Sequence, residues 1–266
     1  MPAPKTPSVP AVERTLAIFE VLAHSRSGLA LSELARRLQV PKSSLHCVLL
    51  TLERTGYIHR NRRTGRYLLG LKLFGLANSA LSGLMLREIA EPFLRSLMEE
   101  THLTVHLAIL EGVEAVLVER VEPPGAARLA TWVGKRMDLH CTAVGKALAA
   151  SLTDEQLNSL IQQRPLLRHN DNTIRSLAKL QKELARVRQM GYAVDDEEEE
   201  AGHRCIGAPI VDSSGRTVAA VSIGGTTLQL TGDNLSVLAM RVTAAAGGIS
   251  AALQLDRIEA AAQPNG

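Results

Sequence analysis

Apolar residues recur at helical spacing in the first part of the chain and predict three consecutive helices. The first is expected over 11–24, where every third or fourth residue is apolar. A short second helix is expected over 32–38, with Ser32 as its N-cap. The third is expected over about 41–55, because Pro41 suits a first helical turn. Two short helices joined by a tight turn predict a helix-turn-helix.

The third predicted helix has two distinct faces. Leu45, Leu49 and Leu52 fall on one face, which we expect to be buried. Small polar and donor groups on the opposite face are suited to the major groove of DNA. The candidate DNA-contacting residues of this helix are Lys42, Ser43, Ser44, His46 and Thr51.

A basic hairpin is expected directly after this helix. The β-prone stretches 57–60 and 66–69 flank a turn that contains Asn61 and Gly65. Such a wing would contact phosphates or enter a minor groove, although an ordinary exposed loop would have the same composition. The candidate contact residues of the wing are Arg60, Arg62, Arg63 and Arg66.

Charge is divided unevenly along the chain. Residues 1–75 contain twelve Lys and Arg against four acidic residues, a net +8, whereas 76–266 contain 18 basic and 23 acidic residues, a net −5. A basic front part is suited to docking on a polyanion, because each neutralised phosphate releases counterions. The charge pattern therefore supports double-stranded DNA as a partner.

The rest of the chain mixes helices with alternating, strand-like segments. A Leu-rich helix is expected over 71–90, with a kink or restart at Pro92, and its many apolar positions suggest packing on a second subunit. Strands and helices without strict alternation favour an antiparallel α+β domain. The expected strands are 104–109, 113–120, 128–133, 207–211 and 218–223, and the expected helices are 142–150, 154–162, 173–190 and 234–255.

Two motifs in this second half suggest a ligand site. At 139–147 a turn leads into a helix with Thr142 as N-cap, so that the first backbone N–H groups could hold a carboxylate or carbonyl ligand. Close packing of small residues explains the motif equally well. The second motif is the run of six acidic residues at 195–200, which we expect to be mostly a solvated loop with one carboxylate pointing inward.

Length and composition predict the number of domains, the cellular location and the state of the cysteines. A chain of 266 residues is long enough for two domains, and no apolar run approaches the length that spans a bilayer. The N-terminus has four prolines and no apolar core of a signal peptide, so we expect a cytoplasmic protein without a membrane partner. The three cysteines, which lack a paired motif, are expected to be free thiols. They are Cys47, Cys141 and Cys205.

From residue 10 to about 255 the chain resembles transcriptional regulators of the IclR family. The resemblance is carried by AVERTLAIFEVLA, LSELARRLQVPKSSLHCVLLTLERTGYI and RYLLGLKLFGLA, and then by the two motifs described above. It implies a winged helix-turn-helix over 10–75, a linker helix over 76–91 and a GAF-like effector-binding domain over 92–257, with flexible tails at 1–9 and 258–266.

The resemblance also implies the ligand and the positions that bind it. Family ligands are mostly small carboxylates and aromatic catabolites, so a small organic effector that modulates operator binding is expected. No cofactor is expected, and a homodimer, or a homotetramer, would read paired half-sites. The pocket positions fall on Ala143, Val144, Asp195, Cys205, Ser222 and Gly224.

Two other function classes fit parts of the sequence. A cysteine hydrolase would need a base placed against Cys141, but the adjacent His140 cannot easily reach it at a helix start, so no enzyme is expected. A zinc sensor is the second alternative, because several potential ligands could meet in space. These ligands are His140, Cys141, His203 and Cys205.

Overall fold

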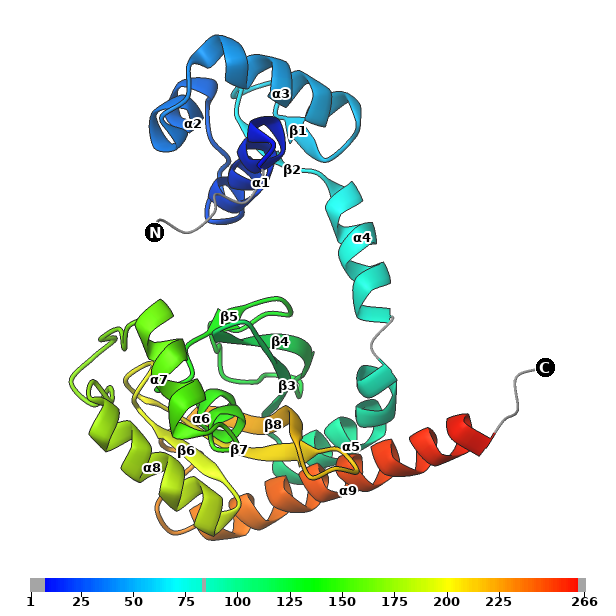
Figure 1. The fold of residues 1–266 in the computed structure, drawn as a ribbon, viewed down its shortest axis with the longest axis vertical. Helices are drawn as coiled ribbons and strands as arrows, with labels where there is room; N and C mark the ends of the chain where they lie inside the picture. The colour runs from blue at the N-terminus through cyan, green and yellow to red at the C-terminus, as the bar shows by residue number, and fades with distance from the viewer. Residues whose placement is uncertain (1–7, 83–84, 263–266) are drawn as a thin grey trace, which may run out of the picture. The chain divides into compact units, whose positions relative to one another are not determined.

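Three helices and a two-stranded sheet form residues 10–69 of the chain (Figure 1). The computed structural model describes residues 8–82 and 85–262, and the chain divides into two compact units, 1–83 and 84–266. In the first unit the order is α1 (Pro10–Ala23), α2 (Leu31–Leu38), α3 (Lys42–Arg54), β1 (Ile58–Arg60), β2 (Tyr67–Leu69) and α4 (Leu71–Ser82).

A small hydrophobic core holds these elements together. The apolar face expected of the third helix is buried, and Gln39 takes a left-handed conformation (φ 53°) that makes the tight turn between α2 and α3. Leu29 pairs with Tyr67 as an isolated bridge beside the antiparallel pair β1–β2. The fully buried core residues are Ile18, Leu34, Leu45, Leu49, Ile58 and Tyr67.

The start of α2 differs from the sequence-based expectation. The N-cap is Ala30 and not Ser32, and no side chain caps the helix from that position. Instead the backbone N–H of Ala30 donates to Glu33 Oε2 at 2.8 Å. A carboxylate in the first turn therefore stabilises the helix start and satisfies one backbone donor.

Two helices occupy the region where one linker helix was expected. They are α4 (Leu71–Ser82) and α5 (Met85–Thr101), and α5 belongs to the second unit. Pro92 lies inside α5, so the helix neither restarts nor ends there. The expected linker over 76–91 thus comprises the end of α4 and the beginning of α5.

A six-stranded antiparallel sheet forms the centre of the second unit. Its spatial order is β5-β4-β3-β8-β7-β6. Its strands are β3 (Thr104–Glu111), β4 (Glu114–Val121), β5 (Arg136–Met137), β6 (Ala193–Asp196), β7 (His203–Val211) and β8 (Thr217–Thr226).

Helices cover both faces of this sheet (Figure 1). On one face lie α6 (Ala143–Ala149), α7 (Asp154–Gln163) and α8 (Leu177–Met190), and on the other lie α5 and α9 (Leu235–Ala262). Close approach of α9 to α5 needs Gly248, since a Cβ there would lie 2.6 Å from the ring of Phe93.

Several predicted boundaries in this unit need correction. No strand covers 128–133, where the chain is irregular, and the edge position is taken by β5. Strand β6 was not predicted, and α8 begins at Leu177 because Ser176 caps it. Helix α9 continues to Ala262, into the expected tail. Residues 1–7 and 263–266 of the expected tails lie outside the described residues.

Helix α9 is long and apolar. Over Leu235–Leu255 its mean hydropathy is 1.4, which is enough by length and composition to cross a membrane. Its inner face includes Val242, Ala246 and Ile249, which are buried against the sheet and α5. Only 28% of that stretch is buried, so α9 packs one face on the unit and leaves the other exposed.

Candidate functional site

The outer face of α3 is exposed and polar. Apolar side chains of α3 anchor its inner face in the core, and this fixes the direction of the opposite face. The Thr51 hydroxyl donates to the Cys47 carbonyl at 3.0 Å and keeps its lone pairs available as acceptors. Each candidate α3 residue is exposed, namely Lys42, Ser43, Ser44, His46 and Thr51.

The wing turn is built by Asn61. Its Oδ1 accepts the backbone N–H groups of Arg63 and Thr64 at 3.0 and 3.1 Å, and Gly65 has φ +68°. These bonds order a turn whose Arg62 and Arg63 side chains remain exposed. The turn therefore presents two guanidinium groups for which no partner is found within the described part of the chain.

The remaining two arginines of the wing differ from this pair. Arg60 is exposed, with its guanidinium 5.5 Å from the Tyr67 ring centroid. Arg66 turns inward, where it donates to the Gly28 carbonyl at 2.7 Å and forms an ion pair with Glu33 at 3.0 Å. These bonds engage part of the guanidinium within the domain, and they favour a role for Arg66 in positioning the wing over the phosphate contact expected from sequence.

In the second unit, the predicted pocket residues lie on one face of the sheet. Asp195 on β6 pairs with Cys205 on β7, and Cys205 pairs with Gly224 on β8. Residues opposite one another in antiparallel strands point to the same face, and so do residues two apart along a strand. Ser222 therefore shares this face, and Gly207 lies opposite it.

The beginning of α6 lies directly over this face. A Cβ on Gly207 would be 2.8 Å from the backbone of Ala143, so helix and strand touch there. Thr142 caps the helix as predicted, since its Oγ1 accepts the Gly145 N–H at 3.1 Å. The cap thereby satisfies the Gly145 N–H, which leaves the N–H groups of Ala143 and Val144 for a ligand.

Asp195 is the most perturbed acid at this face. Its side chain is 4% exposed, and burial raises its pKa to about 7, with the charges of Glu198 and Glu199 adding to the effect. One oxygen, Oδ1, accepts the N–H groups of Glu198 and Glu199 at 2.8 and 3.4 Å. Near neutral pH the carboxyl group can therefore either donate or accept a hydrogen bond.

Sequence reasoning missed three residues around this face. His106 is buried on β3, paired with Ser222, and its Nε2 is 2.9 Å from Thr131 Oγ1. Burial, together with the charges of Arg120 and Lys135, lowers the His106 pKa to about 3, so its ring is neutral. Leu129 lies close to Gly224, where an added Cβ would be 3.0 Å from its Cδ1.

These contacts show that the irregular segment 122–135 lies over the pocket positions. It continues to Lys135, which forms an ion pair with Glu199 at 2.9 Å and lies 5.8 Å from the Trp132 ring centroid. Because the sequence pattern predicts a strand over 128–133, which includes Leu129 and Thr131, that pattern does not indicate this cover. The polar His106 within an apolar strand was the available signal.

The acidic run is less solvated than expected. Glu198 is only 8% exposed, and its Oε1 accepts from Lys146 Nζ at 2.5 Å, while Lys146 itself is fully buried on α6. Glu183 Oε1 also accepts from Lys146 at 3.2 Å. This cluster links α6 and α8 to the 195–200 loop, and therefore to Asp195.

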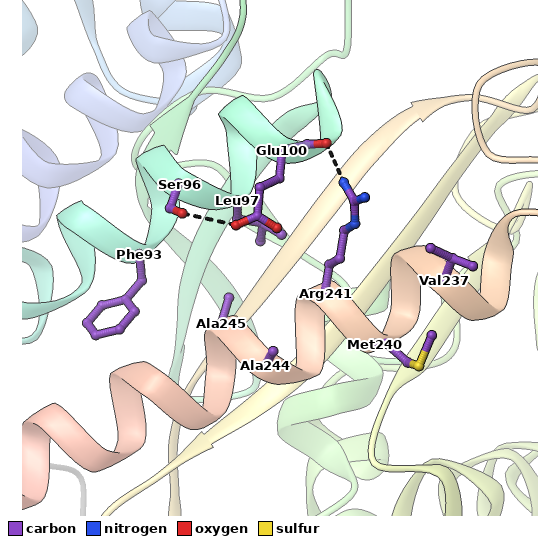
Figure 2. A pocket seen from close by; sticks show the side chains of 9 residues that line it. All are labelled: Phe93, Ser96, Leu97, Glu100, Val237, Met240, Arg241, Ala244 and Ala245. Carbon is purple, nitrogen blue, oxygen red and sulfur yellow. Dashed lines mark hydrogen bonds between the residues drawn. The ribbon is translucent and has the colours of Figure 1, made fainter.

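A further groove lies elsewhere in the second unit. Figure 2 shows it between α5 and α9, with a volume of about 430 Å³. Its floor is apolar, and at one end Arg241 donates to the carbonyl oxygen of Glu100. The lining residues are Phe93, Ser96, Leu97, Glu100, Val237, Met240, Arg241, Ala244 and Ala245. The predicted pocket residues are on the opposite face of the sheet.

Two family profiles match this chain in tandem. The IclR helix-turn-helix domain matches residues 11–62, and the C-terminal domain of bacterial IclR transcriptional regulators matches residues 78–251. The chain belongs to the IclR family. Members of the IclR family among its relatives are transcriptional regulators and not enzymes, and this chain is a DNA-binding transcriptional regulator.

Similar proteins cover nearly the whole chain. The regulator XynR of Escherichia coli K12 is 35% identical over 217 residues, 82% of this chain and 86% of its own. The transcriptional repressor IclR of the same strain is 32% identical over 252 residues, 94% of this chain and 92% of its own.

Solved structures of IclR proteins share the fold. Thermotoga maritima IclR has a TM-score of 0.74 at 30% identity, covering 91% of this chain and 98% of its own. An IclR homologue from Microbacterium hydrocarbonoxydans, complexed with 4-hydroxybenzoate, has a TM-score of 0.77 at 27% identity and the same two coverages. The mixed α+β fold with its antiparallel sheet is thus that of the family.

Proposed function

We propose that this regulator binds a small organic acid between the start of α6 and the sheet, and that binding changes its affinity for operator DNA. The observation that carries the proposal is the convergence on one sheet face of residues from β6, β7, β8 and α6. The 4-hydroxybenzoate complex of the Microbacterium homologue supports an aromatic or aliphatic carboxylate as the ligand class. The proposed effector site consists of Ala143, Val144, Asp195, Cys205, Ser222 and Gly224.

The chemistry of the proposed site suits a carboxylate. The backbone N–H groups of Ala143 and Val144 supply two donors, and the protonated form of Asp195 supplies a third through its hydroxyl. Ser222 can donate or accept, while Cys205 and Leu129 provide apolar surface. A ligand that enters must displace Leu129, so effector binding would move the 122–135 segment.

The DNA-binding half of the proposal uses the outer face of α3 and the wing. Ser44 and His46 would contact base edges, while Arg62 and Arg63 would contact phosphates or the minor groove. Arg66 is left out of this set because its guanidinium holds Glu33 and Gly28. The proposed contacts are Lys42, Ser43, Ser44, His46, Thr51, Arg60, Arg62 and Arg63.

Assembly and location follow from the proposed mode of action. Two-fold oligomers place recognition helices about one turn of DNA apart, so we propose a homodimer or a tetramer of dimers in the bacterial cytoplasm. An effector that binds one arrangement of the oligomer more tightly would shift its population.

The proposal is tested with the full-length protein in two steps. Small carboxylates and aromatic acids, with 4-hydroxybenzoate among them, are screened for a rise in melting temperature, which a ligand selective for the folded state must produce. Operator sequences are selected from random DNA and titrated with and without each stabilising acid at fixed salt. We expect a change in operator affinity, and an unchanged affinity at saturating acid would refute the coupling.

A further inference from the structure

Four metal-ligating side chains meet beside the start of α6. One potential ligand atom from each lies within 4.8 Å of all the others. The group combines two imidazoles, one thiol and one carboxylate, and it comes from the segment before α6 and from the α7–α8 connection. We call this group the 138–169 cluster, and its members are Asp138, His140, Cys141 and His169.

We propose that a divalent cation of the zinc type binds at the 138–169 cluster, separately from the effector. Nitrogen and sulfur donors with one carboxylate, four in number, form the set that zinc takes in tetrahedral sites. Ligand atoms around zinc lie roughly 3.3–3.8 Å apart, given metal–ligand distances of about 2.0–2.3 Å. The most distant ligand atoms, up to 4.8 Å apart, need to approach by roughly 1 Å, whereas His169 Nε2 and Asp138 Oδ2, now 2.8 Å apart, need to separate by about 0.5 Å or more.

The hydrogen bonds of the two histidines favour this role. His140 Nε2 is 2.9 Å from the carbonyl oxygen of Leu167, which can only accept, so the neutral ring carries its proton on Nε2 and a lone pair on Nδ1. Backbone carbonyls orient metal-bound histidines in this way. His169 Nε2 and Asp138 Oδ2 are 2.8 Å apart, and the cation would take the place of the proton between them.

Outer contacts hold the carboxylate in place. Arg164 Nε donates to Asp138 Oδ1 at 2.7 Å, which leaves Oδ2 directed toward His169. The positive charge of Arg164 is balanced by Glu114 Oε1, 2.9 Å from its NH1 group. The carboxylate is thereby oriented by a second layer of contacts, as ligands in metal sites are.

The space available fits an ion better than an organic ligand. A cavity of about 20 Å³, lined in part by Asp138 and His140, adjoins the cluster. Such a volume holds little more than one water molecule. The His169 side chain is 33% exposed, which gives the cation a path from solvent.

The site differs from the zinc grouping expected from sequence. Cys205 lies on β7 opposite Asp195 of β6, and His203 Nδ1 is 3.6 Å from Glu200 Oε2. Neither belongs to the cluster, in which Asp138 and His169 take their places. These two residues therefore serve as matched controls of the same chemical types.

Zinc chloride and tag-free full-length protein, stripped of metal, provide the test. We expect one Zn²⁺ per chain by calorimetry and by elemental analysis after gel filtration, with release of the Cys141 thiol proton to buffer as its sulfur coordinates. Cys141→Ala and His169→Gln should each weaken binding by at least about tenfold, the lower end of what losing even an outer partner costs. Cys205→Ala and His203→Gln should bind as the wild type does.

Substitution with Co²⁺ identifies the sulfur ligand independently. A thiolate–cobalt charge-transfer band should appear in the wild type, His169→Gln and Cys205→Ala and be missing in Cys141→Ala. Far-ultraviolet circular dichroism of the metal-free variants establishes that each is folded, and the partly exposed His169 keeps the test valid if Cys141→Ala unfolds. Lack of stoichiometric zinc in the wild type, or binding that depends on Cys205 and His203 instead, would overturn the site.

Discussion

The ammonium group of Lys146 lies 2.5 Å from Glu198 Oε1, although Lys146 is fully buried and Glu198 nearly so. Removing one member of a buried ion pair leaves an uncompensated charge and costs about 3–5 kcal/mol. We expect Lys146→Met to lower the free energy of unfolding, measured with urea, by about that amount.

The double variant Lys146→Met/Glu198→Gln separates charge from packing. It removes both charges of this pair, so part of the stability should return, while Glu183 and the Val194 carbonyl still lack the ammonium donor. Lys179→Met on the exposed face of α8 is the matched control and should change little. A Lys146→Met protein as stable as the control would show that the pair does not stabilise the domain.

Substitutions on the outer face of α3 should change sequence discrimination. Ser44 and His46 are exposed there, so Ser44→Ala or His46→Ala removes a base contact without disturbing the core. We expect a loss of about 1–3 kcal/mol on the selected operator and little change on random DNA, measured by titration at one salt concentration. Equal losses on both DNAs would contradict base contact.

Arginines of the wing should divide into two kinds. Arg62→Ala and Arg63→Ala should weaken binding to all sequences and each reduce the slope of log affinity against log salt by about one. Arg66→Ala should leave that slope unchanged and lower the melting temperature of the N-terminal unit, because its bonds to Gly28 and Glu33 are internal.

Arg175→Ala controls for loss of a positive charge outside the proposed DNA surface. Arg175 is exposed in the second unit, and we expect its replacement to alter neither the salt slope nor the melting temperature appreciably. If Arg66→Ala instead reduced the salt slope as Arg62→Ala does, Arg66 would contact DNA after all.

Asp195 should make stability and effector binding depend on pH. Its pKa of about 7 in the folded protein lies above the ordinary value of 3.8, so the folded state binds the proton more tightly. The resulting stabilisation is complete below about pH 4 and is lost as pH rises through 7. Asp195→Asn lacks this loss, so its stability relative to wild type should rise between pH 5 and 8 by at least about 1.4 kcal/mol, the value of one pKa unit.

The same titration affects a carboxylate effector. Wild-type affinity should increase as pH falls through about 7, because protonated Asp195 donates to the ligand, whereas Asp195→Asn should flatten the profile between pH 6 and 8. Asp196→Asn, at the exposed neighbouring position, serves as control for a lost carboxylate. A stability difference that does not vary with pH would refute the raised pKa.

Substitution of Gly207 tests whether the contact between α6 and the sheet contributes to stability. A Cβ there would meet the Ala143 carbonyl at 2.8 Å, and backbone cannot rotate away as a flexible side chain can. Gly207→Ala should cost about 1–3 kcal/mol in urea unfolding and reduce the thermal shift caused by an effector. Gly232→Ala, where nothing lies within 4 Å, should do neither.

Local periodicity was enough to predict the helix-turn-helix. Leu45, Leu49 and Leu52 follow the helical repeat, and their burial fixes the outer face of α3. The inward turn of Arg66 could not be predicted, because its partner Glu33 is 33 residues away and the two meet only in the folded domain. Capping at Ala30 was not predicted because the bond that stabilises this helix start runs from the Ala30 N–H to the Glu33 carboxylate, and no serine or threonine side chain takes part.

In the second unit, the prediction of the pocket positions rests mainly on the resemblance to the IclR family. Six consecutive acids suggest a solvated loop, yet Lys146, some fifty residues earlier, draws Glu198 inward. Strand-like alternation around Leu129 was misleading because β5 takes the place beside β4. Both the burial of Glu198 and the missing strand over 128–133 depend on contacts between residues far apart in the sequence, and such contacts leave no local pattern.

The segment 122–135 gives the protein an optical reporter of its own. Trp132 is the single tryptophan of the chain, is 59% exposed and lies near the Lys135 ammonium that pairs with Glu199. The tryptophan fluorescence of the protein therefore comes from one residue, in the segment that covers the proposed effector site. The emission wavelength and the quenching of Trp132 can therefore report movement of the 122–135 segment in the unlabelled protein, without attached dyes or substitutions.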